Sequence, residues 1–435
     1  GGAETVKKER RQIDPRKQKR STRVRYTLFR SVLAAAILMT AAFTCSGCSK
    51  KTEPGTAAPS TGENHTTASV DGSEENLQAQ QNKDLPVLNW EEMSPTGSMD
   101  LLYADQFSAD YYEDGIALIT IGDADQFLLL PEGVSAPAGL PASITVLHKP
   151  VKNIYLVATS AMDDFIRLDA LDSIALSGTK ENGWYLPEAK TAMEEGKIAY
   201  AGKYSAPDYE TIVSSSCELA VESTMIYHTP EVKEQLERLG IPVLVERSSY
   251  ESHPLGRMEW IRLYGLLTGK EEEADQIFQE NMNALSDVLA MKPSGKTAAF
   301  FYVTNSGSVN VRKNGDYIAK MIDIAGGTYV PENAGTGENA LSTMNMDFES
   351  FYAAAKDADV LIYNSTIDGE LTTIDELCAK NQLFADFKAV KEDNVWCTGK
   401  NMFQETMGLG DMIRDMNAVF SGNREYAFTY LHQLK

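Results

Sequence analysis

The sequence is poor in the residues from which most active sites and metal centres are built. Five cysteines, four tryptophans and five histidines are spread over 435 residues. The later histidines stand at no spacing typical of a metal site; they are His148, His228, His253 and His432. No Gly-x-Ser-x-Gly elbow, His-Glu-x-x-His helix or phosphate loop is present. We therefore expect no enzyme, no bound metal ion and no resident cofactor.

Positive charge is scarce after the first thirty residues. Residues 1–30 carry eleven Lys or Arg against three acidic residues, a net of +8. Because the whole chain has a net charge of −22, the remainder carries −30. Proteins bind nucleic acids through basic surfaces, because the phosphates are negatively charged. So acidic a body is therefore not expected to bind nucleic acid.

Long apolar runs are also missing. The only early one, Ser31–Phe43, has about thirteen residues, whereas a spanning helix needs roughly 20. A basic start followed by a short apolar core is typical of a secretory signal. The next residues, Cys45-Ser46-Gly47-Cys48, resemble a bacterial lipobox, although Cys45 stands where leucine is usual. We expect residues 1–47 to be a lipoprotein signal and Cys48 to be lipidated; a plain signal or an uncleaved anchor is the alternative.

Residues 48–96 are rich in small and polar residues and predict a flexible tether. The folded part then alternates strand and helix patterns, which predicts parallel sheets with helices on both faces. In a first lobe, 97–256, the expected strands are Ile116–Ile121, Phe127–Leu130, Ile144–Leu147, Ile154–Ala158, Ile198–Ala201, Leu219–Val221 and Pro242–Val245. The expected helices are Met162–Leu171, Tyr209–Ser215 and Pro230–Leu239.

A connecting helix is expected within residues 257–292. Apolar residues recur there at three- and four-residue spacings: Ala274, Ile277, Phe278, Leu285, Val288 and Leu289. Thr268 and Glu271 have the spacing of a capping box, which predicts a helix start. From Gly269 to Met291 such a helix is about 34 Å long. The alternative is an ordinary long helix inside one large domain.

The second lobe, 293–435, repeats the alternation. Its expected strands are Ala298–Val303, Val360–Tyr363 and Asn394–Cys397. Asp316 is expected to cap a helix from Tyr317 to Ile324. Further helices are predicted at Phe348–Ala355, Ile374–Lys380, Met407–Phe420 and Tyr426–Leu434.

About residues 105 to 425 resemble the substrate-binding proteins of bacterial ABC importers for ferric siderophores, haem or vitamin B12. The stretches that carry the resemblance, in order, are Asn153–Tyr155, Ile174–Gly178, Asp208–Glu210, Gly240–Leu244, Leu266–Glu271, Ala325–Gly327, Asp359–Ile362 and Phe387–Val395. Cys217-Glu218 departs from the usual Pro-Asp before a strand. The resemblance implies an α/β fold of two Rossmann-like lobes with mainly parallel sheets, joined by a long helix.

The resemblance also implies a function. We expect a monomer on the outer face of a bacterial membrane, held there only by its lipid anchor. Its partners would be an ABC permease with its cytoplasmic ATPase and a small molecule that brings its own metal. Two other functions stay open at this point: an extracellular enzyme with a similar two-lobed sheet, and a ligand-sensing lipoprotein. The sequence does not identify the chelate or tetrapyrrole.

Candidate binding residues lie in the loops that follow the strands, since ligands bind at that edge of open α/β sheets. Aromatic and cationic side chains there suit a large, partly apolar, anionic ligand: Lys180, Trp184, Tyr185, Arg247, Tyr250, His253, Arg257, Arg312, Lys313 and Lys400. Asp208-Tyr209-Glu210 and Asp347-Phe348-Glu349 are a short repeat, one in each lobe. The resemblance implies that Glu210 and Glu349 meet permease arginines; simple helix capping is the alternative. Cys378 and Cys397 either pair or remain buried thiols.

Overall fold

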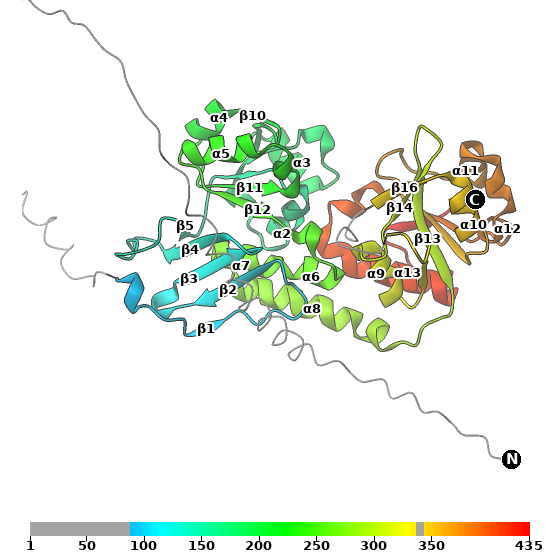
Figure 1. The fold of residues 1–435 in the computed structure, drawn as a ribbon, viewed down its shortest axis with the longest axis horizontal. Coiled ribbons are helices and arrows are strands. Elements are labelled where there is room, and N and C mark those ends of the chain that lie inside the picture. The colour runs from blue at the N-terminus through cyan, green and yellow to red at the C-terminus, as the bar shows by residue number, and fades with distance from the viewer. Residues whose placement is uncertain (1–87, 336–342) are drawn as a thin grey trace, which may run out of the picture. The chain divides into compact units, whose positions relative to one another are not determined.

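The computed structural model describes residues 88–335 and 343–435, which form three larger sheets and one two-stranded ribbon (Figure 1). Two of the larger sheets belong to lobes in which strands alternate with helices. The third comes before them in the chain and is mostly antiparallel. The α/β fold with parallel sheets that the sequence predicts is therefore confirmed.

The third sheet, called here the accessory sheet, keeps its strands in chain order: β1 (Gly97–Ser98), β2 (Phe107–Tyr111), β3 (Ala117–Ile121), β4 (Asp125–Pro131) and β5 (Ile144–Lys149). All neighbours are antiparallel except β4 and β5. The sequence predicts three of these strands but groups them with the parallel sheet of the first lobe, which is wrong. The turn 122–124 between β3 and β4 is too short for a parallel crossover.

The first lobe holds a five-stranded sheet whose neighbours are all parallel, in the order β12-β11-β6-β7-β8. Its strands are β6 (Ile154–Leu156), β7 (Ile174–Ser177), β8 (Ala199–Tyr200), β11 (Leu219–Ser223) and β12 (Val243–Glu246). Helices cover it: α2 (Met162–Arg167), α3 (Pro187–Glu194), α4 (Tyr209–Ser214) and α5 (Pro230–Arg238). The ribbon pairs β9 (Gly202–Lys203) with β10 (Ala206–Pro207). Because both faces of the sheet are covered, its central strands are mainly apolar, although Glu222 on β11 and Glu246 on β12 are buried acids.

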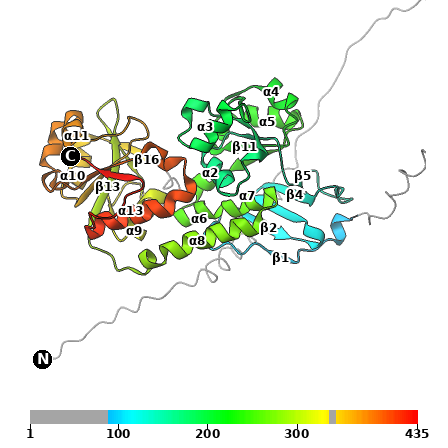
Figure 2. The same cartoon turned by 180° about the vertical axis from the view of Figure 1, so that it is seen from behind.

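Three helices connect the lobes: α6 (Pro254–Glu259), α7 (Ile261–Thr268) and α8 (Glu271–Ala290). The predicted capping box is wrong. Thr268 ends α7 and its hydroxyl donates to the Tyr264 carbonyl at 2.7 Å, while Lys270 is the N-cap of α8. Glu271 still lies in the first turn of α8, where the helix dipole favours it. With 20 residues, α8 is about 30 Å long and packs against α7 and α13 (Leu409–Ser421) (Figure 2).

The second lobe has a seven-stranded sheet, ordered β16-β14-β13-β17-β18-β19, with β15 also paired to β13. The strands are β13 (Thr297–Val303), β14 (Val309–Arg312), β15 (Thr328–Val330), β16 (Thr343–Met346), β17 (Val360–Tyr363), β18 (Val395–Thr398) and β19 (Leu431–Gln433). The remaining α-helices are α9 (Tyr317–Ile324), α10 (Phe348–Ala355), α11 (Ile374–Lys380) and α12 (Lys388–Lys391). The predictions for α9, α10 and α11 are confirmed, including the Asp316 cap on Ile318 N.

The helix predicted at Tyr426–Leu434 is wrong. Part of that segment is β19, which runs antiparallel to β18. The buried carboxylate of Asp415 accepts the backbone N–H groups of Thr429, Tyr430 and Leu431 at 2.6–3.1 Å. A helix would use such N–H groups internally, so this carboxylate holds the segment extended.

One apolar core runs through the accessory sheet, the first lobe, the connecting helices and part of the second lobe. It includes Phe107, Leu219, Phe278, Ile318 and Met412. A separate cluster fills the other face of the second-lobe sheet. In the described ranges, no helix combines the length and apolarity that crossing a membrane requires.

Candidate functional site

The candidate site lies where the carboxyl ends of the parallel strands of the two lobes meet. Gln404, which follows β18, donates from Nε2 to the Gly183 carbonyl at 2.8 Å, and its Oε1 accepts from Tyr185 N at 2.7 Å. Thr406 Oγ1 donates to the Ser160 carbonyl at 2.7 Å. Gly183 and Ser160 belong to the loops after β7 and β6. These bonds bring together the edges at which open α/β sheets bind ligands.

Two predicted arginines, Arg257 and Arg312, converge on one ring. The guanidinium of Arg257, on α6, lies 4.0 Å from the centroid of the Tyr317 ring on α9. Arg312, at the end of β14, lies 5.8 Å from the same centroid. Such positions over a ring face are favourable for cations. Tyr317 was not among the predicted residues, because its place directly after the helix cap Asp316 indicated only a structural role.

The surroundings of these arginines are largely buried. Arg257 is 7% exposed, and its Nη1 donates to the Ser248 carbonyl at 3.0 Å. No described residue partners its Nε. Asp316 faces Arg312 at 3.6 Å; burial raises the pKa of its carboxyl, and Arg312 opposes that rise. Arg257 Nε therefore has no described partner, whereas Arg312 forms an ion pair with Asp316.

Buried acidic and polar side chains lie near Arg257, and the sequence did not predict them. Glu246 accepts Ser248 N at 2.8 Å and Ser160 Oγ at 3.0 Å. Asp164 is 1% exposed, and burial, with Asp163 and Glu246 adding to it, raises the pKa of its carboxyl well above its usual range. Burial likewise raises the pKa of the Tyr264 hydroxyl. A carboxyl group whose protonated form is favoured by burial therefore lies near the arginine.

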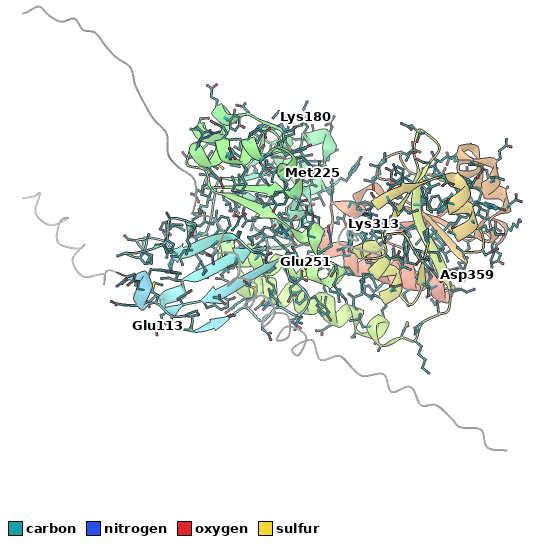
Figure 3. The ribbon with its side chains drawn as sticks, in the orientation of Figure 1. Glu113, Lys180, Met225, Glu251, Lys313 and Asp359 are labelled. Carbon is teal, nitrogen blue, oxygen red and sulfur yellow. The ribbon has the colours of Figure 1, made fainter. Side chains whose placement is uncertain are left out.

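The remaining predicted residues are scattered around this edge. Trp184 is 1% exposed, with Nε1 donating to Ser177 Oγ at 3.3 Å, whereas its neighbour Tyr185 is 47% exposed. Lys180 is exposed and lies 5.5 Å from the Tyr200 ring centroid (Figure 3). Lys400 is exposed as well; its backbone N donates to Glu370 at 3.0 Å.

Arg247 and Tyr250 form a second group at the end of β12. The Arg247 guanidinium lies 4.8 Å from the Tyr250 ring centroid and donates from Nη1 to the Tyr227 hydroxyl at 2.9 Å. Tyr227 was not among the predicted residues. It belongs to the 3-10 turn after β11, where no periodicity distinguishes inward from outward side chains.

His253 acts mainly as a helix cap. Its Nδ1 accepts Leu255 N at 3.2 Å, and its ring stacks on Tyr103 at a centroid distance of 4.7 Å. Burial, with a smaller effect of Lys320, lowers the pKa of this imidazole to about 4. The ring is therefore neutral at physiological pH, with its proton on Nε2.

The two Asp-aromatic-Glu triplets adopt the same geometry in the two lobes. Asp208 accepts Thr211 N at 3.1 Å and Thr211 Oγ1 at 2.7 Å. Asp347 accepts Ser350 N at 2.8 Å and Ser350 Oγ at 2.7 Å. The aspartates thus cap α4 and α10. Glu210 and Glu349 are exposed in the first turns of these helices, and their carboxylates make no hydrogen bond or ion pair within the described ranges.

Metal and thiol chemistry find little support in the part of the chain that is described. No three His, Cys, Asp or Glu side chains gather there in a way that could hold a metal ion. Cys217, Cys378 and Cys397 are all free, so the disulfide left open by the sequence does not form in this structure. Burial raises the pKa of the Cys397 thiol to about 11.

Comparison with known proteins identifies the class. Residues 155–402, more than half of the chain, match the periplasmic binding protein family, and the chain belongs to that family. Its members work with ABC transporters and bind small ligands; they are not enzymes. The expectation that this chain is no enzyme is therefore confirmed.

Individual relatives are distant. Two uncharacterized lipoproteins of Methanocaldococcus jannaschii are 24% identical over 357 residues and 25% identical over 334 residues. These alignments cover 76% and 74% of this chain and 83% and 82% of the relatives. Among solved structures, the periplasmic heme binding protein HutB of Vibrio cholerae has a TM-score of 0.50 at 15% identity, covering 60% of this chain and 97% of that one. The TroA-like periplasmic binding protein FepB of Veillonella parvula has the same TM-score at 15% identity, covering 66% and 96%.

Proposed function

We propose that this chain is an extracytoplasmic, lipid-anchored binding protein that delivers a ferric siderophore, haem or cobalamin to an ABC permease. The observation that supports the ligand class most is the approach of Arg257 and Arg312 to the Tyr317 ring. Arg257 comes from the connecting helices and Arg312 from the second lobe, beside the meeting carboxyl edges. Guanidinium groups favour the anionic oxygens of a chelate or of a tetrapyrrole carboxylate, and the ring supplies an apolar surface.

Membrane attachment is proposed through Cys48. This residue lies outside the described ranges, so the support is the lipobox-like sequence and the relatives that are named lipoproteins. Permease docking is proposed through Glu210 and Glu349. Because Asp208 and Asp347 already cap the two helices, the exposed glutamate side chains are not needed as caps and can form ion pairs with permease arginines.

Ligand binding is tested directly on the purified full-length chain. Tryptophan fluorescence and native mass spectrometry would follow titration with a ferric siderophore, haem and cyanocobalamin. We expect one molecule of one of these probes per chain. Binding that survives replacement of both Arg257 and Arg312 by Gln, or no binding of any probe to the wild type, overturns the proposal.

A further inference from the structure

The accessory sheet and its loops reach the candidate site at two predicted residues: Tyr103 stacks on His253, and Gln106 contacts Arg247. This sheet precedes residues 155–402, the part of the chain that matches the family. Its Gln106 lies just before β2, and Gln106 Oε1 accepts both Arg247 Nε at 3.1 Å and Arg247 Nη2 at 3.0 Å. Arg247 in turn follows β12, at the carboxyl edge of the first lobe.

Gln106 is itself held firmly. Its Nε2 donates to Asp105 Oδ1 at 2.8 Å, which turns the amide oxygen toward Arg247. The backbone N–H groups of Asp105 and Gln106 donate to the carboxylate of Glu251 at 3.0 Å. Glu251 is 1% exposed and also accepts Trp260 Nε1 at 3.0 Å (Figure 3). A buried acid next to the first lobe thus anchors the loop that carries Gln106.

The turn between β3 and β4 supports the same arginine from a second side. Gly122 has a φ of +58°, and a Cβ built there would lie 3.2 Å from Arg247 Nε and 3.3 Å from its Cζ. The guanidinium therefore packs closely on a bare Cα. A side chain at position 122 would meet both the positive φ and this contact.

The side chain that contacts Arg247 is neutral, although the segment around it is strongly acidic. Residues 88–147 include ten Asp or Glu and no Lys, Arg or His. In so acidic a segment the side chain that meets Arg247 is nevertheless a neutral amide. It fixes the guanidinium without cancelling its charge, whereas a carboxylate at 106 would form an ion pair.

The hydrogen-bond donors of Arg247 and Tyr227 that have no partner among the described residues indicate which ligand groups can bind here. A guanidinium has five N–H groups, and the bonds to Gln106 and Tyr227 use three of them. The Tyr227 hydroxyl accepts from Arg247, so its own proton is free to donate, and this side chain is 43% exposed. Two N–H groups and one O–H group therefore remain for acceptors at this edge.

We infer that the accessory sheet is a working part of the ligand site, in which Gln106 is a positioning residue that holds Arg247 and Tyr227 as paired donors for an anionic oxygen, such as a carboxylate, of the bound ligand. The inference rests on the proposed function, because it needs a ligand at this edge. It assigns to the site a residue that lies before residues 155–402, the segment that matches the family.

The test compares dissociation constants of the full-length chain and its variants for the haem, ferric siderophore or cyanocobalamin probe that binds the wild type. Arg247→Gln is expected to weaken binding about 30-fold, the effect of losing charge-assisted hydrogen bonds. Gln106→Ala is expected to weaken it about fivefold, and to add nothing in the Arg247→Gln background, because Gln106 acts through Arg247.

Gln106→Glu separates positioning from simple structural support. A carboxylate at 106 keeps both hydrogen bonds from Arg247 but gives up the donation to Asp105. Because it also neutralises Arg247, we expect about tenfold weaker binding, a larger loss than in Gln106→Ala. The matched control is Gln126→Ala, which removes an amide of the same sheet that contacts Thr120; its affinity should equal that of the wild type.

The outcomes are distinguishable. If no probe binds the wild type, the proposed function fails and this inference falls with it. If a probe binds and Gln106→Glu matches the wild type, the proposed function stands and the role of the accessory sheet is overturned. A fivefold loss in Gln106→Ala that persists undiminished in the Arg247→Gln background also overturns it.

Discussion

The guanidinium of Arg257 lies 4.0 Å from the centroid of the Tyr317 ring, and this pair joins the connecting helices to the second lobe. Arg257 reaches it from α6, next to the buried carboxyl of Asp164, while Tyr317 opens α9. A cation that is held between lobes, with a buried Nε and no described partner for it, has donor capacity left for a ligand.

Replacing Arg257 by Gln should weaken ligand binding about 10- to 100-fold, because a hydrogen bond to a charged group contributes roughly 1.5–3 kcal/mol. Fluorescence titration with the probe that binds the wild type measures this. Arg238→Gln, at an exposed position on α5, is the matched control and should leave affinity unchanged. A folded Arg257→Gln protein with wild-type affinity would remove Arg257 from the site.

Replacing Cys48 by Ala should abolish membrane attachment. A lipidated cysteine would be the first residue of the mature protein, so its loss leaves either a released protein or an unprocessed precursor. Cell fractionation and the mass of the mature protein measure the result, and Cys45→Ala serves as the control. Unchanged membrane association and mass in Cys48→Ala would contradict the lipid anchor.

Local signals let the sequence predict many elements closely. Asp316 before an apolar helical pattern marks α9, and Pro230 at a helix start with Gly240 beyond its end marks α5. What the sequence did not resolve is the partner of each strand. The sequence patterns predicted β3, β4 and β5 as strands correctly. Which strands pair into one sheet depends on tertiary contacts that these local patterns do not carry.

Side-chain direction in loops was equally hard to predict. Trp184 and Tyr185 are neighbours in one loop, yet the first is 1% exposed and the second 47%. Loops lack the two- or 3.6-residue period that separates inward from outward positions in strands and helices. Gln106 and Tyr227 also lie in irregular segments, and no sequence pattern marked them as site residues. Their place in the site follows only from their hydrogen bonds to Arg247, which is not their neighbour in sequence.

Glu222 should make stability depend on pH. It is fully buried on β11, neither carboxylate oxygen has a partner among the described residues, and burial raises its pKa to about 8. A raised carboxyl pKa means that the folded state prefers the neutral form. Below pH 4.5, the ordinary pKa of a glutamate, Glu222 is neutral in both the folded and the unfolded protein. As the pH rises from there toward 8, the unfolded state gains stability by ionising and the folded protein becomes less stable relative to it.

Glu222→Gln keeps the shape and removes the titration. It should match the wild type near pH 4 and exceed its free energy of unfolding near pH 7 by up to about 3 kcal/mol. Urea unfolding at the two pH values measures the difference, and Glu210→Gln, which is exposed, is the control. Equal pH dependence of Glu222→Gln and the wild type would show that Glu222 ionises freely in the folded protein.

The last prediction separates docking from capping in the repeated triplets. Exposed ion pairs contribute only about 0–1 kcal/mol each, so docking should be weak, sensitive to salt and dependent on both lobes. Replacing Glu210 and Glu349 together by Ala should abolish uptake in cells that carry the cognate permease. Ligand affinity and melting temperature should stay close to wild type, because neither carboxylate bonds to a described residue.

The aspartates of the same triplets provide the matched control. Asp208 and Asp347 accept hydrogen bonds from Thr211 and Ser350, and these bonds lower the pKa of both carboxyl groups. Their contribution to stability is thus present at neutral pH and is lost as pH falls through the lowered values. Replacing both by Ala should lower the melting temperature at pH 7, and much less at low pH, while uptake per folded molecule persists. Wild-type uptake in the Glu210→Ala, Glu349→Ala double variant would refute the docking role, because capping alone then accounts for the triplets.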